Sequence, residues 1–80
     1  MEIRFHPHAL IRMRERGATE EEVLSTIQEG EKFPVKFGRT GFRRNFPFDS
    51  EWMNHSYKTK QIEAYVVQED QNWVVILVYS

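Results

Sequence analysis

The spacing of apolar residues changes once along this chain, near Glu31, and that change constrains the fold more than any other feature. Before Glu31, apolar residues recur every three or four positions, which is the spacing of one face of an α-helix. After Glu31, they alternate with polar residues, as they do in half-buried β-strands. This order predicts an α+β domain in which the helices come first and one antiparallel sheet follows.

The first part of the chain predicts a short strand and a helix. Residues 3–5 form the candidate strand. Pro7 suits the first position of a helix, because proline has no N–H group to leave unpaired there. Gly17 is typical of the position just past a helix end. We therefore expect a helix over 7–16, with Ile11 outside its apolar face and available to another element or a partner.

A second helix is predicted by its N-terminal cap. Thr19 and Glu22 have the spacing of a capping box, in which each side chain pairs with the backbone N–H of the other residue. Gly30 ends the apolar pattern that follows. Three residues join this helix to the first one. The two helices should therefore form a hairpin over 7–29.

Four strands are predicted after the helices, as an antiparallel meander with the helical hairpin packed on one face. Pro34 puts the first of them at an edge of the sheet, because proline cannot donate to a neighbouring strand. The last is apolar on both faces, which is typical of a buried central strand. The phenylalanines of the first two strands are expected in the core. The predicted strands are 33–37, 42–48, 60–68 and 73–79, with a turn at 38–41 and a polar loop at 49–57.

Length and composition set further limits. A chain of 80 residues corresponds to a single domain, 1–80. It has no cysteine, which excludes disulfides, thiolate zinc sites and a cysteine nucleophile. Its longest apolar run, 73–79, is far shorter than the roughly 18 residues of a membrane span. The start of the chain also lacks the pattern of a signal peptide. We expect a cytoplasmic protein that does not contact the membrane.

Charge is distributed unevenly along the chain. The net charge is −1 and the pI about 6.3, which is evidence against a dedicated nucleic-acid binder. However, residues 19–31 carry −5 and residues 32–44 carry +5. The basic block forms part of a basic surface if it meets the arginines of the first helix in space. The alternative is that both blocks are solvated faces without a partner.

Neither a cofactor nor a metal ion is expected. The chain has no phosphate-binding glycine loop, no nucleophile elbow and no His-Glu-x-x-His helix. Its histidines, His6, His8 and His55, have no neighbouring carboxylates or thiolates to complete a coordination shell.

One row of the first helix is a candidate catalytic group. His8, Arg12 and Arg16 follow each other at four-residue spacing, which puts them on one stripe. The helix dipole disfavours a protonated His8 in the first turn. A neutral imidazole beside guanidinium groups suits a general base near an oxyanion. The alternative is that the arginine stems cover the sheet edge while their heads pair with carboxylates of this chain, namely Glu15, Glu20 or Glu63.

A second candidate group surrounds the turn between the first two predicted strands. Arg39, Arg43 and Arg44 interleave there with phenylalanines, and such a pattern can bind phosphates and stack bases. Lys58 and Lys60 add two cations near the third strand. The alternative is a structural hairpin, whose phenylalanines are core and whose charged residues discourage edge pairing.

The helical pattern carries a family resemblance. The motif His8-x-x-x-Arg12-Met13-x-x-Arg16-Gly17, with the glutamates after it and the C-terminal Val-Val-Ile-Leu-Val-Tyr strand, resembles a bacterial family of small, often gene-paired proteins whose domain has no known function. The likeness covers nearly the whole chain. The element order is also similar to the RelE and BrnT toxin superfamily, whose members are ribonuclease partners in toxin–antitoxin pairs.

That resemblance implies a RelE-like fold and metal-independent RNA cleavage, with His8, Arg12 and Arg16 as the only positions that match the family motif. Such cleavage needs a base for the 2′-hydroxyl, a cation for the phosphorane and an acid for the leaving oxygen. It also implies two partners, RNA and a small antitoxin-like protein. The alternative function is a non-catalytic interaction module of the same fold, for which a homodimer is one arrangement. The two hypotheses differ in whether the helical row and the basic strands share one surface.

Overall fold

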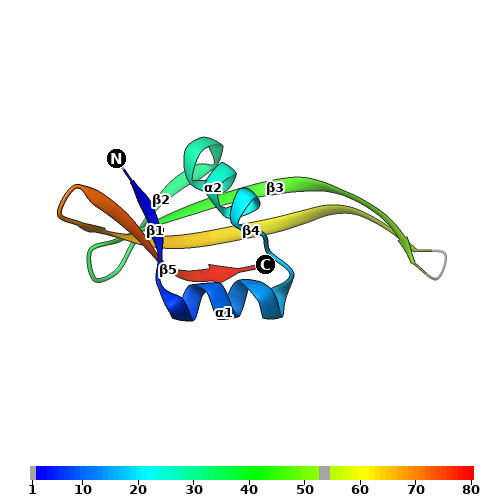
Figure 1. Ribbon diagram of the computed structural model, residues 1–80. Coiled ribbons are helices and arrows are strands. Elements are labelled where there is room, and N and C mark those ends of the chain that lie inside the picture. Colours follow the sequence, from blue (N-terminus) through cyan, green and yellow to red (C-terminus); the bar gives the residue numbers. More distant parts are fainter. Residues whose placement is uncertain (1, 53–54) are drawn as a thin grey trace.

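The computed structural model describes residues 2–52 and 55–80, with side chains described for 2–47 and 60–80. It confirms the predicted α+β fold, with an N-terminal strand, two helices and a four-strand antiparallel meander (Figure 1). The elements are β1 (Ile3–Phe5), α1 (Pro7–Arg16), α2 (Glu20–Glu29), β2 (Glu31–Val35), β3 (Arg39–Trp52), β4 (His55–Glu69) and β5 (Asn72–Tyr79).

The sheet is mixed rather than purely antiparallel. Its strand order is β1-β5-β4-β3-β2, and β1 pairs with β5 in parallel. A parallel pair needs a long crossover connection. The two helices and the meander together supply that connection. In this strand order, β4 occupies the centre of the sheet.

Both helices begin and end where local chemistry predicts. The Thr19 hydroxyl accepts from the N–H of Glu22 at 3.1 Å, and the Glu22 carboxylate accepts from the N–H of Thr19 at 2.9 Å, so the capping box is complete. Helix α1 ends at Arg16 and is capped by Gly17, whose φ of +70° lies in the left-handed region that glycine adopts at low cost.

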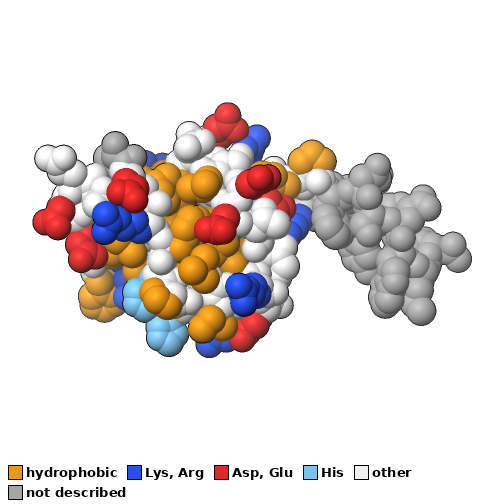
Figure 2. All heavy atoms as spheres, in the orientation of Figure 1, with side chains coloured by type: hydrophobic (Ala, Val, Ile, Leu, Met, Phe, Trp, Pro, Cys, Tyr) orange, Lys and Arg blue, Asp and Glu red, His pale blue; other side chains and the backbone are white. Residues whose placement is uncertain are grey.

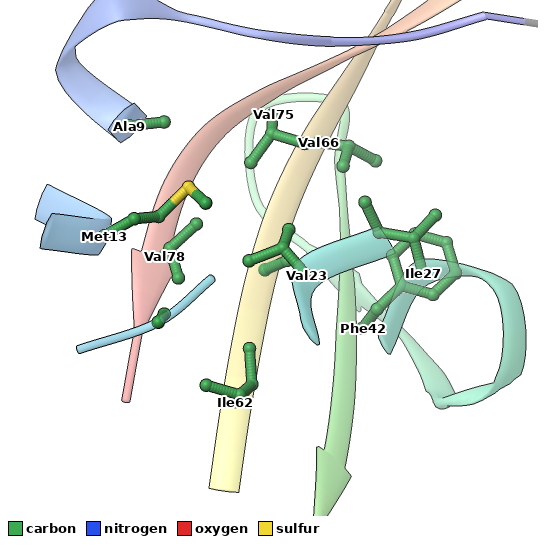
Figure 3. Close-up of a cluster of buried hydrophobic side chains, with 11 residues drawn as sticks. Ala9, Met13, Val23, Ile27, Phe42, Ile62, Val66, Val75 and Val78 are labelled. Carbon is green, nitrogen blue, oxygen red and sulfur yellow. The ribbon is translucent and has the colours of Figure 1, made fainter. Parts of the chain in front are cut away.

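The core lies between the two helices and one face of the sheet. Ala9 and Met13 of α1 and Val23 and Ile27 of α2 converge on the buried strand residues (Figure 3). The end of α2 packs closely on β3, because a Cβ added to Gly30 would lie 2.7 Å from the Arg43 carbonyl oxygen. The buried strand residues are Phe42, Ile62, Ala64, Val66, Val75 and Val78.

The predicted polar loop at 49–57 is wrong for the residues that the structure describes, 49–52 and 55–57, and residues 53–54 lie outside them. Strands β3 and β4 continue to Trp52 and from His55, and the ladder resumes after a register shift between Pro47 and Ser50. Polar composition suggested a loop, but strand pairing requires only backbone hydrogen bonds. The result is a long two-stranded ribbon that extends well past the helices (Figure 1).

The prediction that the last strand is central and buried on both faces is also wrong. Val75 and Val78 of β5 are fully buried, but Ile76 is only half-buried. Tyr65 pairs with Leu77 while Val66 pairs with Val75, so Ile76 is an extra residue at a β-bulge. Helices cover one face of the sheet only, so the other apolar face of β5 keeps contact with solvent.

The first turn of the meander lies earlier than predicted. The strand expected over 33–37 ends at Val35, and residues 36–38 form the turn. Phe37, expected in the core, is instead 88% exposed. Phe42 is buried as expected, and Phe46 packs against the core.

Hydrophobic side chains gather in the middle of the molecule in the view of Figure 2, and acidic and basic groups are scattered around them. Within the described part of the chain, no helix has both the length and the apolar character needed to cross a membrane.

Candidate functional site

The face of the sheet opposite the helices carries a group of polar and aromatic side chains. Phe42, Ile62 and Ala64 point into the core beneath the helices. Side chains alternate along a strand, so their neighbours Arg43 and Glu63 point to the opposite face. We call this surface the open face and define it by Phe33, Arg43, Glu63, Tyr65 and Tyr79, which are all half-buried or exposed.

An aromatic row crosses the open face from β2 to β5. The rings of Phe33 and Tyr65 meet edge to face, with centroids 6.1 Å apart, and the centroids of Tyr65 and Tyr79 are 5.5 Å apart. Gly41 of β3 lies beneath this row, because a Cβ added there would be 2.5 Å from Cζ of Phe33. The glycine therefore allows the Phe33 ring to cross β3 and reach β4.

A guanidinium group covers each end of this row. Arg43 lies over the Phe33 ring, with Cζ 4.8 Å from the centroid. Arg16, at the end of α1, lies over the Tyr79 ring at 4.9 Å and also donates to the Val78 carbonyl oxygen. Both distances are within the range of favourable cation–π contacts.

A carboxylate occupies the centre of the open face. Glu63 accepts a hydrogen bond from the Tyr65 hydroxyl at 3.2 Å and lies 3.5 Å from Arg43. Its side chain is 23% exposed. Burial raises the pKa of the Tyr65 phenol, and the negative charge of Glu63 raises it further. The phenol therefore stays protonated and can act as a proton donor next to a carboxylate.

The predicted helical row reaches the open face at one end. Arg16 contacts Tyr79 there, as described above. Arg12 pairs with Glu15 at 3.1 Å on the exposed side of α1. His8 stacks on His6 with ring centroids 5.2 Å apart at the start of the helix. Eight residues of helix separate His8 from Arg16, which corresponds to about 12 Å.

The predicted cluster of basic strand residues is divided between the two faces of the sheet. Arg43 lies on the open face, and alternation along β3 puts Arg39 on the same side. Arg44 points toward α2, where it donates to Ser25 and pairs with Glu29 at 2.7 Å.

Of the two lysines in the predicted group, only Lys60 has a described side chain. Lys60 lies on the helix side of the sheet, where it donates to the Gly17 carbonyl oxygen and pairs with Glu22 at 3.1 Å. The side chain of Lys58 lies outside the described residues, as does that of His55.

Sequence reasoning missed Glu63, Tyr65 and Tyr79 as site residues. A signal for the first two was available, because the alternation of Ile62, Ala64 and Val66 puts the residues between them on the opposite face. No local signal indicates that Tyr79 meets Tyr65, since only the pairing of β4 with β5 brings them together.

Among the described residues, no group of three or more histidine, aspartate or glutamate side chains is arranged to hold a metal ion. The open face itself offers the Glu63 carboxylate, the Tyr65 phenol, two guanidinium groups and the contacting aromatic rings.

Comparison with known proteins identifies one relationship. A family model described as a domain of unknown function, DUF4258, matches residues 5–80. No curated protein and no solved structure matches the chain.

Proposed function

The chain belongs to the DUF4258 family, a domain of unknown function, and we propose that it binds RNA on the open face of its sheet and cleaves it without a metal ion. The observation that carries this proposal is the contact of Glu63 with both Arg43 and Tyr65 beside an aromatic row. In this proposal the protein is a toxin-like ribonuclease that a small antitoxin-like partner holds inactive. The likeness of its element order to the RelE and BrnT toxins supports that role.

Binding would use the two ends of the aromatic row. Tyr79 is 41% exposed, so the part of its ring that Arg16 leaves uncovered can accept a base by stacking. Arg16 and Arg43 are guanidinium groups on the same face, and each can make bidentate hydrogen bonds to a phosphate. Arg43 would exchange part of its pairing with Glu31, whose side chain is 69% exposed, for the phosphate.

Cleavage would use Glu63 and Tyr65 as a linked pair. The 2′-hydroxyl gives its proton to the Glu63 carboxylate, and its oxygen forms a bond to the adjacent phosphorus. The bond from phosphorus to the 5′-oxygen breaks, and that oxygen takes the Tyr65 proton. The products are a 2′,3′-cyclic phosphate and a 5′-hydroxyl. The proton on Glu63 then returns to Tyr65 along their hydrogen bond, while Arg43 stabilises the phosphorane charge.

This proposal assigns the base to Glu63 instead of His8. His8 and Arg12 stay candidate phosphate-binding residues of α1 in this proposal, and Arg12 would exchange its pairing with Glu15 for a phosphate. His8 stays the alternative base, and the experiment compares the two residues directly.

The test measures binding and cleavage of a mixed-sequence RNA in the presence of a chelator. We expect Glu63→Gln, which is nearly isosteric, to lower the cleavage rate on the order of 10²- to 10⁴-fold with little change in affinity. His8→Ala should change the rate by only a few-fold, and Glu20→Gln on the far helix serves as the matched control. Loss of cleavage in His8→Ala with full activity in Glu63→Gln would contradict the assignment of the base.

A second candidate function is a non-catalytic interaction module, with a homodimer as one arrangement. It is favoured by the pairing of Arg12, Arg43, Arg44 and Lys60 with carboxylates of this chain, which leaves fewer cations for a ligand. Non-specific nucleic-acid binding has dissociation constants of roughly 1 to 100 μM. Wild-type protein that neither cleaves RNA nor binds it better than about 100 μM at low salt would rule out the first function. Sedimentation would then test for the homodimer.

A further inference from the structure

The turn between β2 and β3 holds an aromatic side chain in an unfavourable position. Phe37 is 88% exposed, the largest exposure among the large hydrophobic residues described. Its φ is +67°, in the left-handed region that bulky residues rarely adopt. Both features disfavour phenylalanine here, and a glycine would remove both. A ring this exposed contributes little to the core of the described residues, and a contact outside the chain would account for its presence.

Charge around the turn indicates what that contact is. Lys36 and Arg39 flank Phe37, and the whole block 32–44 has five positive charges and no negative one. Arg43 and Arg44 of this block are paired with carboxylates. Lys36 and Arg39, by contrast, form no ion pair with the described residues. A partner for this turn should therefore be anionic and should offer a flat apolar surface to a single ring.

We propose that the turn 36–39 binds single-stranded nucleic acid, with one base stacked on Phe37 and flanking phosphates paired with Lys36 and Arg39. Base stacking needs only one exposed ring, and cations beside it track the backbone. An anionic membrane fits less well, because interfacial binding depends on a larger buried apolar surface than one ring provides.

The turn also lies in line with the open face. Arg39 and Arg43 are on the same side of β3, four residues apart, which corresponds to about 13 Å. The turn is at the opposite end of β3 from the long ribbon (Figure 1). A strand bound at Glu63 can therefore run along β3 and end on Phe37. That extended path rests on the proposed function, whereas stacking at the turn does not.

The test uses a single-stranded DNA oligonucleotide, because DNA lacks the 2′-hydroxyl and reports binding without cleavage. Fluorescence anisotropy at low salt should show that Phe37→Gly and Phe37→Asn weaken binding by about 5- to 100-fold, in line with the loss of one stacked base. Phe37→Trp should retain wild-type affinity. Ile11→Ala, which truncates another exposed apolar side chain, should not change binding.

Thermal unfolding separates this role from a structural one. Glycine and asparagine tolerate the left-handed conformation, so both variants should unfold at or above the wild-type temperature while binding less well. If the substitutions lower both the unfolding temperature and the binding affinity, the ring has a structural role and the proposal is contradicted. So would wild-type affinity of Phe37→Gly, or the absence of oligonucleotide binding by the wild type. Phe37-dependent binding to phosphatidylserine vesicles without oligonucleotide binding would identify a membrane contact instead.

The experiments distinguish failure of the proposed catalysis at Glu63 from failure of the proposed stacking at Phe37. If Phe37 governs oligonucleotide binding but Glu63→Gln does not affect RNA cleavage, only the catalytic assignment fails. If Glu63→Gln abolishes cleavage but Phe37→Gly binds DNA as the wild type does, only the stacking turn fails.

Discussion

At the scale of single residues, alternation along β3 decides which charges face a ligand. Arg43 and Arg44 are neighbours in sequence, yet one stacks on Phe33 of the open face and the other pairs with Glu29 of α2. A block of positive charge in a strand is thus split between two surfaces. Only half of such a block can serve one binding site.

Glu22 is the residue whose titration should affect stability. Partial burial by itself would raise its pKa, but the hydrogen bond from the Thr19 N–H and the pairing with Lys60 outweigh burial, so the pKa lies below the ordinary 4.5. A lowered pKa means that the charged form favours the folded state. This contribution is complete above about pH 4.5 and is lost as the pH falls through the lowered pKa.

We therefore predict that Glu22→Gln lowers the free energy of unfolding at pH 7 and has a much smaller effect at pH 2. Glutamine can still form a capping box, so the helix end should remain intact. Urea unfolding at both pH values provides the measurement, with Glu21→Gln as control. An equal deficit at both pH values would show that the Glu22 charge does not contribute.

At the scale of elements, the helices are specified locally and the strands are not. The capping box of α2 and the glycine stop of α1 both lie within a few residues of the helix ends that they define. The bounds of β3 and β4 depend on each other, because each provides the backbone partners of the other through a shifted register. That dependence is why the polarity of 49–57 did not predict their extent.

For the helical caps, we predict that Thr19→Ala lowers the free energy of unfolding by about 1 kcal/mol through loss of the hydroxyl acceptor. Glu20→Ala, in the same turn but outside the capping box, should cost only a few tenths of a kcal/mol through the helix dipole. Chemical denaturation of both variants tests the difference. Equal effects would mean that the cap contributes no more than the dipole.

At the scale of the whole molecule, one layer of two helices covers one face of the sheet and leaves the other open. Ile62 of the central strand β4 is fully buried under the helices. Ile76 of β5 lies at the bulge and is only half-buried. The sequence alone assigned the greatest burial to the strand of Ile76, because that strand has the longest apolar run.

Substitution of these two isoleucines tests which strand lies at the centre of the sheet. We predict that Ile62→Ala costs roughly 2–5 kcal/mol, since it leaves a cavity in a packed core. Ile76→Ala should cost clearly less, because water already reaches that side chain. Equilibrium unfolding of the two variants decides the order. A larger loss for Ile76→Ala would contradict the central position of β4.

The sequence by itself determined whatever depends on near neighbours in the chain. The two helices, their caps and the change from helical to alternating spacing were all available there, and with them the α+β class. The same alternation is sufficient to place Glu63 and Tyr65 on one face of their strand, without knowledge of how the strands pair.

Only the tertiary structure decided which strands meet. It paired β1 with β5, made β4 central and brought Tyr79 to Tyr65. It also placed Phe37 at an exposed turn and directed Arg44 and Lys60 to the helices instead of the open face. The physical reason is that side-chain spacing reports the period of an element, whereas strand order, register and bulges arise from hydrogen bonds between segments that are distant in sequence.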